Sequence, residues 1–396
     1  MRRVVAPLAG AALALAACGG DDGGSASPTT ATSQTSATAS ADSTTTGAAG
    51  TTSEAPEASA AQSDLERFKV PASELPPLPS ITGEIPDGLE VYLIATGNET
   101  DRLIGEGMSD AAKLLGWSVE VINTDRRDPA QATAAVRSAL ESGADAIVVP
   151  SVQAAAIAEG IAEADEQGVP IVQIGSSEPD QFAGAVNAIT ANADLYGQIM
   201  AAATAADAEK AGNVAHVGIL TSGALTFLAP VFDAFTSQLE SYCADCSTEL
   251  IDAPVAELAS GQASTSIVSA LQRNPDLNYV LTLGNFAAGV RPGLDSNGYE
   301  SVKIVGYLPT PALLQEMLDS PDGYVGWVVV PNRYDGFNAV DAVLRAKTGG
   351  DPTVHNEEAE PLWIVGPDSD IDPSALPELP FDYAQAFAAL WGVAGS

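Results

Sequence analysis

Basic residues, histidine and cysteine are scarce in this chain. Its 396 residues include 16 Lys and Arg against 52 Asp and Glu, with 2 His and 3 Cys, and the formal net charge is −36. Proteins that bind nucleic acid without regard to sequence neutralise phosphates with Lys and Arg, so we expect no nucleic-acid partner. The same shortage argues against a basic patch for anionic lipids. The acidity itself is typical of a solubilising surface and says little about a ligand.

Sequence motifs of common enzymes are also missing. The chain contains neither a Walker A sequence nor Gly-x-Ser-x-Gly. His216 lies within an apolar run and is interpreted as structural, while His355 lies in a polar segment typical of a solvated surface. Acidic residues are so abundant that no pair of them stands out as an acid and a base. We therefore expect a protein without enzyme activity, cofactor or metal.

The N-terminus has the pattern of a bacterial lipoprotein signal. Arg2 and Arg3 precede an apolar stretch, 4–17, which is long enough for a signal peptide and too short to span a bilayer. It ends in Leu15-Ala16-Ala17-Cys18, which resembles a lipobox. The pattern predicts cleavage after residue 17, lipid attachment at Cys18 and an extracytoplasmic protein held on the cell membrane, in the cell envelope or periplasm. The alternative is an ordinary secretory signal with an incidental cysteine.

The two remaining cysteines are Cys243 and Cys246. In an oxidising compartment this spacing favours a small-loop disulfide. Free thiols are the next interpretation. A zinc site is not favoured, because no further Cys or His lies nearby in the sequence.

Composition separates the chain into a tether and a folded body. Residues 18–63 are mainly Ser, Thr, Ala, Gly and Asp and are predicted to be disordered, with an end-to-end reach of roughly 35–40 Å. Residues 64–88 are rich in proline and predict an extended lead-in. The fold is expected to begin near Leu89.

From there short apolar runs alternate with helical periodicity. In the first half the expected strands are 89–95, 117–122, 145–149 and 169–174, and the expected helices are 101–115, 129–140 and 152–167. In the second half the expected strands are 214–220, 248–251, 279–283 and 302–307, and the expected helices are 194–208, 230–242 and 265–273. Continuous Val/Ile runs separated by helices predict parallel sheets covered on both faces. The sequence thus predicts an α/β fold of two doubly wound lobes, with a ligand cleft beyond the carboxyl ends of the strands.

The order and spacing of these segments resemble the type I periplasmic binding proteins, in particular the sugar-binding branch typified by ribose-binding protein. The resemblance covers about residues 89–396. It is carried by segments that keep the family's order: 143–150 (GADAIVVP), 168–172 (GVPIV), 277–285, 302–307 (VKIVGY) and 387–392 (FAALWG).

The resemblance implies two lobes joined by a three-segment hinge, with crossings near 189–192, 308–310 and 331–332. It thereby assigns 89–190 and 309–331 to the first lobe, and 191–308 and 332–396 to the second. Closure of the hinge around a guest is the implied motion. The implied partners are a small-molecule ligand and the permease subunits of an ABC transporter, and a monomer is expected.

Candidate ligand-binding residues follow from the loops at the strand ends and from the last hinge. They are Asn98, Glu99, Ser151, Ser176, Ser177, Thr221, Phe227, Asn285, Phe286, Tyr307 and Asn332.

Several positions depart from the pattern of the monosaccharide-binding members. Gly175-Ser176 stands where an Asp-Arg pair is usual, Phe286 and Leu308 replace aspartates, and Ala229 replaces an arginine. A sugar with many hydroxyls would then leave buried groups unpaired, at a cost of about 1–3 kcal/mol each. We therefore expect a less polar or aromatic guest between Phe227 and Phe286. The alternative is that these aromatic side chains pack between the lobes and another loop supplies the polar contacts.

These features together predict a substrate-binding lipoprotein of an ABC importer, which captures a small molecule, sugar-like or less polar and aromatic, in a cleft between its lobes. A ligand-sensing protein that acts on a membrane receptor would have the same fold, and a secreted α/β enzyme is the more distant alternative.

Overall fold

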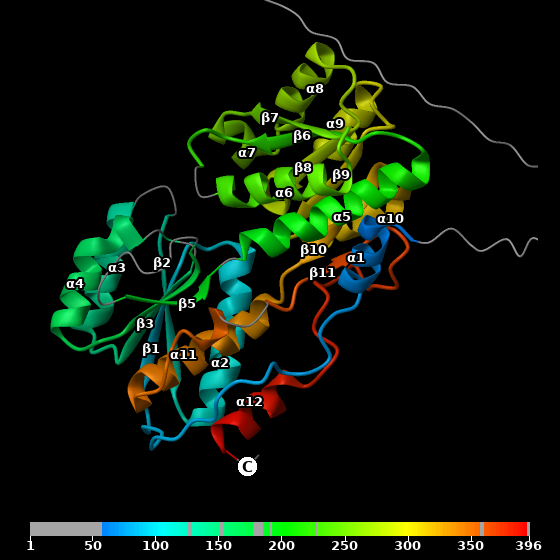
Figure 1. Cartoon of the computed structure of the whole chain (residues 1–396). Coiled ribbons are helices and arrows are strands. Elements are labelled where there is room, and N and C mark those ends of the chain that lie inside the picture. Colours follow the sequence, from blue (N-terminus) through cyan, green and yellow to red (C-terminus); the bar gives the residue numbers. More distant parts are fainter. Residues whose placement is uncertain are drawn as a thin grey trace, which may run out of the picture. The chain divides into compact units, whose positions relative to one another are not determined.

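The computed structural model describes residues 58–125, 129–150, 152, 154–176, 185–190, 192–225, 228–356 and 360–393 (Figure 1). The expected signal peptide, Cys18 and most of the expected tether lie outside these ranges. So do Ser151, Ser177 and Phe227, while Ser176 is described in its backbone alone. No helix of the described part is long and apolar enough to cross a membrane.

The first lobe is built on a parallel five-stranded sheet in the order β2-β1-β3-β4-β5. Its strands are β1 Glu90–Ala95, β2 Ser118–Asn123, β3 Ala146–Pro150, β4 Ile171–Ser176 and β5 Ala185–Thr190. Every residue of β3 is buried, as a central parallel strand requires. β5 is an addition to the strands that the sequence predicted.

Helices cover both faces of this sheet. α2 (Glu99–Leu115) and α11 (Asn332–Thr348) pack against each other and share one apolar cluster with the strand residues Leu93 and Val148. α3 (Pro129–Glu141) and α4 (Ala158–Glu166) pack with Ile147 and Val149, which alternate with Val148 and so lie on the opposite face. The α2–α11 contact is close, because a Cβ on Gly107 would lie 2.0 Å from the carbonyl oxygen of Arg333.

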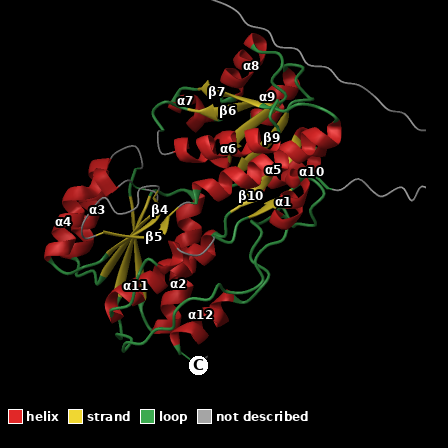
Figure 2. Cartoon of the chain, viewed as in Figure 1, coloured by secondary structure: helices red, strands yellow, loops and turns green. Residues whose placement is uncertain are grey.

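The second lobe is built on a six-stranded sheet in the order β11-β10-β9-β8-β6-β7, in which only β11 is antiparallel to its neighbour. Its strands are β6 His216–Thr221, β7 Ser247–Asp252, β8 Tyr279–Leu283, β9 Lys303–Tyr307, β10 Tyr324–Val329 and β11 Trp363–Val365. The helices are α5 Ala193–Ala211, α6 Ala229–Tyr242, α7 Val255–Ser260, α8 Ser264–Arg273, α9 Val290–Ser296 and α10 Pro311–Asp319. The α5–α6 pair packs in one core cluster, and α7 to α10 pack in another. Figure 2 shows these helices around the strands of the sheet. The expected α/β fold with parallel sheets in two lobes is confirmed.

The structure corrects the predicted assignment of residues to lobes. Residues 309–331 belong to the second lobe, because β10 pairs in parallel with β9 and α10 connects these two strands. Thr310 caps α10 and Pro311 opens it, so the chain at 308–310 turns into a crossover helix rather than a hinge. α11 lies on α2 and contacts β4 and β5, which places 332–348 in the first lobe.

The chain accordingly passes between the sheets at other points. It leaves the first sheet after β5 and enters α5 at residue 193, near the first expected hinge. It returns between β10 and α11, near the expected crossing at 331–332. A further passage precedes β11, and the tail helix α12 (Tyr383–Trp391) then packs on α2 and α11.

A helix also begins inside the expected tether. α1 spans Ala60–Phe68, where Ser59 accepts a hydrogen bond from the backbone of Gln62 at the N-cap. Ala61 and Phe68 are buried against α5, and this burial explains why a short helix forms in a polar stretch. Residues 69–88 contain neither helix nor strand, in line with the expected lead-in.

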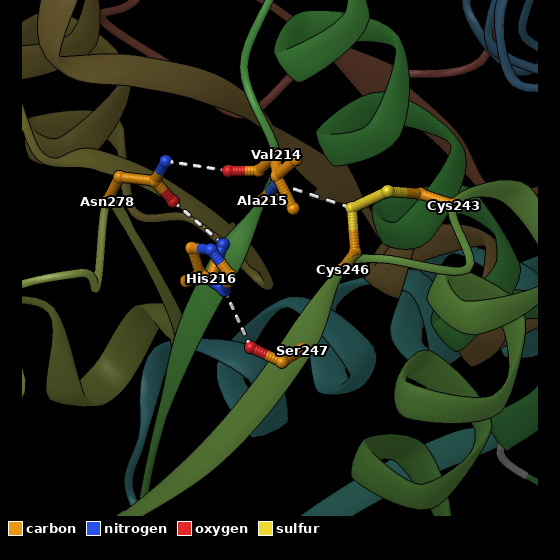
Figure 3. Close-up of a disulfide and its surroundings, with 7 residues drawn as sticks. All are labelled: Val214, Ala215, His216, Cys243, Cys246, Ser247 and Asn278. Atoms are coloured by element: carbon orange, nitrogen blue, oxygen red, sulfur yellow. Dashed lines mark hydrogen bonds between the residues drawn. A yellow bond between two sulfur atoms is a disulfide. The ribbon is translucent and has the colours of Figure 1, made fainter.

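A disulfide joins Cys243 and Cys246, the pair suggested by their spacing, with an S–S distance of 2.00 Å (Figure 3). Cys246 accepts a 3.3 Å hydrogen bond from the backbone of Ala215. Beside it, His216 contacts Ser247 at 2.8 Å through its ring, as expected for a structural histidine. Among the described residues no group of three or more His, Cys, Asp or Glu could hold a metal ion.

Removing this disulfide should have a modest effect. It closes a loop of four residues, for which chain entropy gives a stabilisation of about 2 kcal/mol. We expect Cys243→Ser/Cys246→Ser to lower the free energy of unfolding by that amount or less, measured by urea denaturation. A loss of twice that size would contradict a purely local role.

Candidate functional site

The carboxyl ends of the parallel strands bring the candidate ligand residues to the loops of each sheet. Of the eleven candidates, seven have described side chains. They are Asn98, Glu99, Thr221, Asn285, Phe286, Tyr307 and Asn332.

Asn98 lies directly after β1 and forms the N-cap of α2. Its side-chain oxygen accepts a hydrogen bond from the backbone of Asp101 at 2.8 Å, and its amide donates to Thr96 Oγ1 at 2.8 Å. Asn98 also lines a cavity of about 640 Å³. Glu99 is paired with Arg102 at 2.6 Å, and hydrogen bonding to this guanidinium lowers the pKa of the Glu99 carboxyl. Its carboxylate is therefore already occupied.

Asp101 is a residue of this site that was not predicted from the sequence. Its side chain is fully buried, and its Oδ2 accepts two 2.6 Å hydrogen bonds from the backbone and hydroxyl of Thr96. Its Oδ1 has no hydrogen-bond partner among the described residues and is shielded from solvent. Leaving a buried acceptor unpaired costs about 1–3 kcal/mol.

In the second lobe the turns after β8 and β9 lie against each other. A Cβ on Gly284 would be 1.9 Å from the carbonyl oxygen of Leu308. Asn285 is exposed in the first turn, while Phe286 is half-buried and packs against both large apolar clusters. Leu308 has φ = 55°, a left-handed conformation that costs a non-glycine residue about 1–3 kcal/mol. The structure thus brings Asn285, Phe286 and Leu308 together.

The other second-lobe candidates are less available to a guest. Thr221 ends β6 and is partly exposed, and its backbone oxygen accepts a hydrogen bond from Ala253. Tyr307 is 5% exposed, and its ring packs edge-on against Tyr196 with centroids 5.3 Å apart. Asn332, the first residue of α11, is also buried. The structure therefore places Tyr307 and Asn332 in the interior rather than on an open surface.

A mostly buried acidic cluster, which was not predicted from the sequence, includes Tyr307. It consists of Asp335, Glu360, Tyr196 and Tyr307. Tyr196 donates a 3.2 Å hydrogen bond to Glu360 Oε1. Among the described residues, Glu360 Oε2, Asp335 Oδ1 and the Tyr307 hydroxyl have no hydrogen-bond partner. The backbone of Asn192, in the first passage between the sheets, also hydrogen bonds to Glu360, which precedes β11. Asp335 lies near the start of α11, at the return passage. Three passages of the chain between the sheets therefore converge at this cluster.

The two carboxyl groups of this cluster hold protons unusually strongly. Burial raises the pKa of Glu360 to about 7. Burial, and then the charge of Glu360, raise the pKa of Asp335 well above its ordinary value. At neutral pH the pair therefore carries less charge than two exposed acids would.

The cluster makes stability depend on pH. Between pH 4.5 and about 7 the folded protein keeps protons that the unfolded chain releases, so the free energy of unfolding should fall as pH rises through this window. We expect Glu360→Gln to make that fall shallower, by on the order of 3 kcal/mol across the window. Urea denaturation at pH 5, 6, 7 and 8 measures it. Exposed Glu300→Gln is the control, and equal slopes in both variants would refute the assignment.

The architecture is that of a known protein family. A model of the periplasmic binding protein domain matches residues 91–351. The chain belongs to this family. The match begins at β1 and ends just beyond α11, so it includes both parallel sheets apart from β11.

The relatives described below are distant in sequence. The ribose import binding protein RbsB of Bacillus subtilis is 25% identical over 205 residues, which are 51% of this chain and 63% of that protein. The chain thus matches less than two thirds of the length of that relative. A solved structure of GanP, a glucose-galactose binding protein from Geobacillus stearothermophilus, is similar with a TM-score of 0.61 and 19% identity, over 72% of this chain and 100% of GanP.

Another similar structure is a carbohydrate transporter solute binding protein from Agrobacterium radiobacter in complex with D-arabinose. It has a TM-score of 0.58 and 19% identity, over 72% of this chain and 97% of that one. At this identity the likeness establishes the fold. Almost the whole of both solved structures is matched by less than three quarters of this chain, so this binding protein carries additional segments.

Proposed function

We propose that this protein is the substrate-binding lipoprotein of an ABC importer, which captures a small molecule between its two lobes by hinge closure. The observation that carries the proposal is the pair of parallel sheets in a periplasmic binding protein fold, each with polar side chains on the loops at its strand ends. Asn98 supplies such a group in the first lobe, and Asn285 does so in the second. A guest that contacts both sets would favour the closed arrangement.

We propose a sugar-like guest with an apolar face. The partly exposed Asn98 and the exposed Asn285 can pair with a small number of hydroxyl or amine groups. Phe286 and Leu308 offer an apolar surface beside them. The relatives named above bind ribose, glucose or galactose, and arabinose according to their names. Those sugars are therefore the reference compounds, and aryl glycosides or deoxy sugars are the expected better ligands.

Calorimetric titration tests the ligand class. We expect the compounds with an apolar face to bind more tightly than ribose, arabinose, glucose or galactose, since Phe286 and Leu308 replace charged partners. Asn285→Ala should weaken binding about tenfold, equivalent to one lost hydrogen bond. The control is Asn213→Ala, an exposed asparagine in the loop before β6. Preferential binding of an unsubstituted hexose or pentose would overturn the apolar-face proposal, and catalytic turnover of a bound compound would overturn the binding-protein role.

Membrane anchoring is tested separately. The Leu15-Ala16-Ala17-Cys18 sequence supports lipidation at the cysteine. We expect Cys18→Ser to move the protein from the membrane fraction to the soluble fraction, with loss of an acylated N-terminal peptide in mass spectrometry. Retention of the variant on membranes would show that another feature anchors the chain.

A further inference from the structure

The N-terminal segment of this chain is fastened to both lobes. Its first part, α1, is docked on α5 of the second lobe, where Ala61 and Phe68 are buried. Asp64 accepts a 2.5 Å hydrogen bond from the hydroxyl of Tyr242 on α6. The start of the helix is held as well, because Ser59 Oγ donates to Glu209 at 2.5 Å.

The part that follows α1 is fastened to the first lobe. The carbonyl oxygen of Pro79 accepts a 2.7 Å hydrogen bond from Arg345 on α11. Arg345 is itself buried and ion-paired with Asp341 on the same helix at 2.5 Å, which fixes its position. Further along, the carbonyl oxygen of Pro86 accepts a 2.7 Å hydrogen bond from the indole of Trp117.

Between these anchors the chain is stiffened by proline. The connection from Phe68 to Pro79 contains no helix or strand and includes Pro71, Pro76 and Pro77. Proline-rich segments adopt an extended conformation of about 3.1 Å per residue and act as semi-rigid spacers. Eleven fully extended residues would span roughly 30–35 Å, and this connection is shorter because the backbone N–H of Leu78 donates a 2.8 Å hydrogen bond to the carbonyl oxygen of Pro76. Its prolines fix φ at several positions, so the segment resists changes in the separation of its two ends.

A second proline-rich segment accompanies the first. Residues 366–382 lead from β11 in the second sheet to α12 on the first lobe, and Figure 1 shows this red trace beside the blue one. Lys69 and Pro71 of the first segment line one cavity of about 450 Å³ together with Ile371 and Pro377 of the second. The first segment begins before the family match, and the second lies beyond it.

We propose that residues 69–79 form a strut that limits how far the two lobes open, and that the docking of α1 on α5 anchors this strut to the second lobe. The proposal rests on the hinge motion in the proposed function. With α1 docked, the strut holds the ligand-free lobes near one separation. When α1 leaves α5, the strut loses its anchor on the second lobe and the lobes open further.

Distances between spin labels on the two lobes test the strut without any ligand. The labels are placed at exposed helix positions, Ser138→Cys on α3 and Gln272→Cys on α8, in a full chain that also carries Cys18→Ser. Electron paramagnetic resonance should give one narrow distance distribution. Phe68→Asp buries a charge in the α1–α5 contact and should add a second, displaced peak. The matched control is Ser63→Asp, which places the same charge on the exposed face of α1 and should keep the single peak.

A second variant keeps α1 docked and softens the strut. Replacing Pro71, Pro76 and Pro77 by Ser should also produce the displaced peak, because the connection then becomes flexible. Hydrogen exchange of residues 60–68 reports whether α1 is released in each variant. Release of α1 in Phe68→Asp with an unchanged distribution would overturn the proposal, as would an unchanged distribution in the proline variant. Failure of all compounds in the calorimetric panel leaves this readout intact, so the strut and the ligand proposal fail independently.

Discussion

The burial of parallel strands on both faces is the constraint on which this molecule depends. β3 and β8 are buried along their whole length, so neither can carry a side chain that meets a ligand. Polar side chains within reach of a ligand therefore lie beyond the strand ends, where Thr96, Asn98 and Asn285 are found. The same constraint requires helices on both faces of each sheet. The passages between the lobes use other connections, those before α5, α11 and β11.

Much of the fold could be predicted from the sequence, because Val/Ile runs and helical periodicity are local signals. Tyr279–Leu283 was predicted with its observed bounds. Membership of a lobe is not a local property, and here prediction failed. Tyr324–Val329 is apolar enough for the centre of either sheet, and only its pairing with β9 decides between them. α11 was misplaced for the same reason, since the close contact of Gly107 with Arg333 joins residues more than 200 positions apart.

The candidate site was predictable as a set of loops but not as a set of contacts. Asn98 and Glu99 lie where expected, yet their side chains are already paired within α2 and its N-cap. Asp101, Asp335 and Glu360 were missed because an acid carries no signal in a chain with 52 of them. What distinguishes Asp101 and Asp335 is the burial of the whole residue, and Glu360 is distinguished by a buried Oε2. This burial depends on the packing of α2, α11 and the segment before β11.

The buried acids and the strut both affect the opening between the two lobes, by different means. Asp335 and Glu360 lie where passages between the sheets converge, and their burial is tolerated because the pair retains protons. Any opening that admits water to this cluster would lower those pKa values and favour ionisation, which in turn disfavours reclosure. A strut that limits the opening would therefore help to keep water away from the two carboxyl groups. The proline-rich segments and the buried carboxyl groups thus act together. The segments limit how far the lobes open, and the carboxyl groups raise the free energy of an opening that exposes them to water.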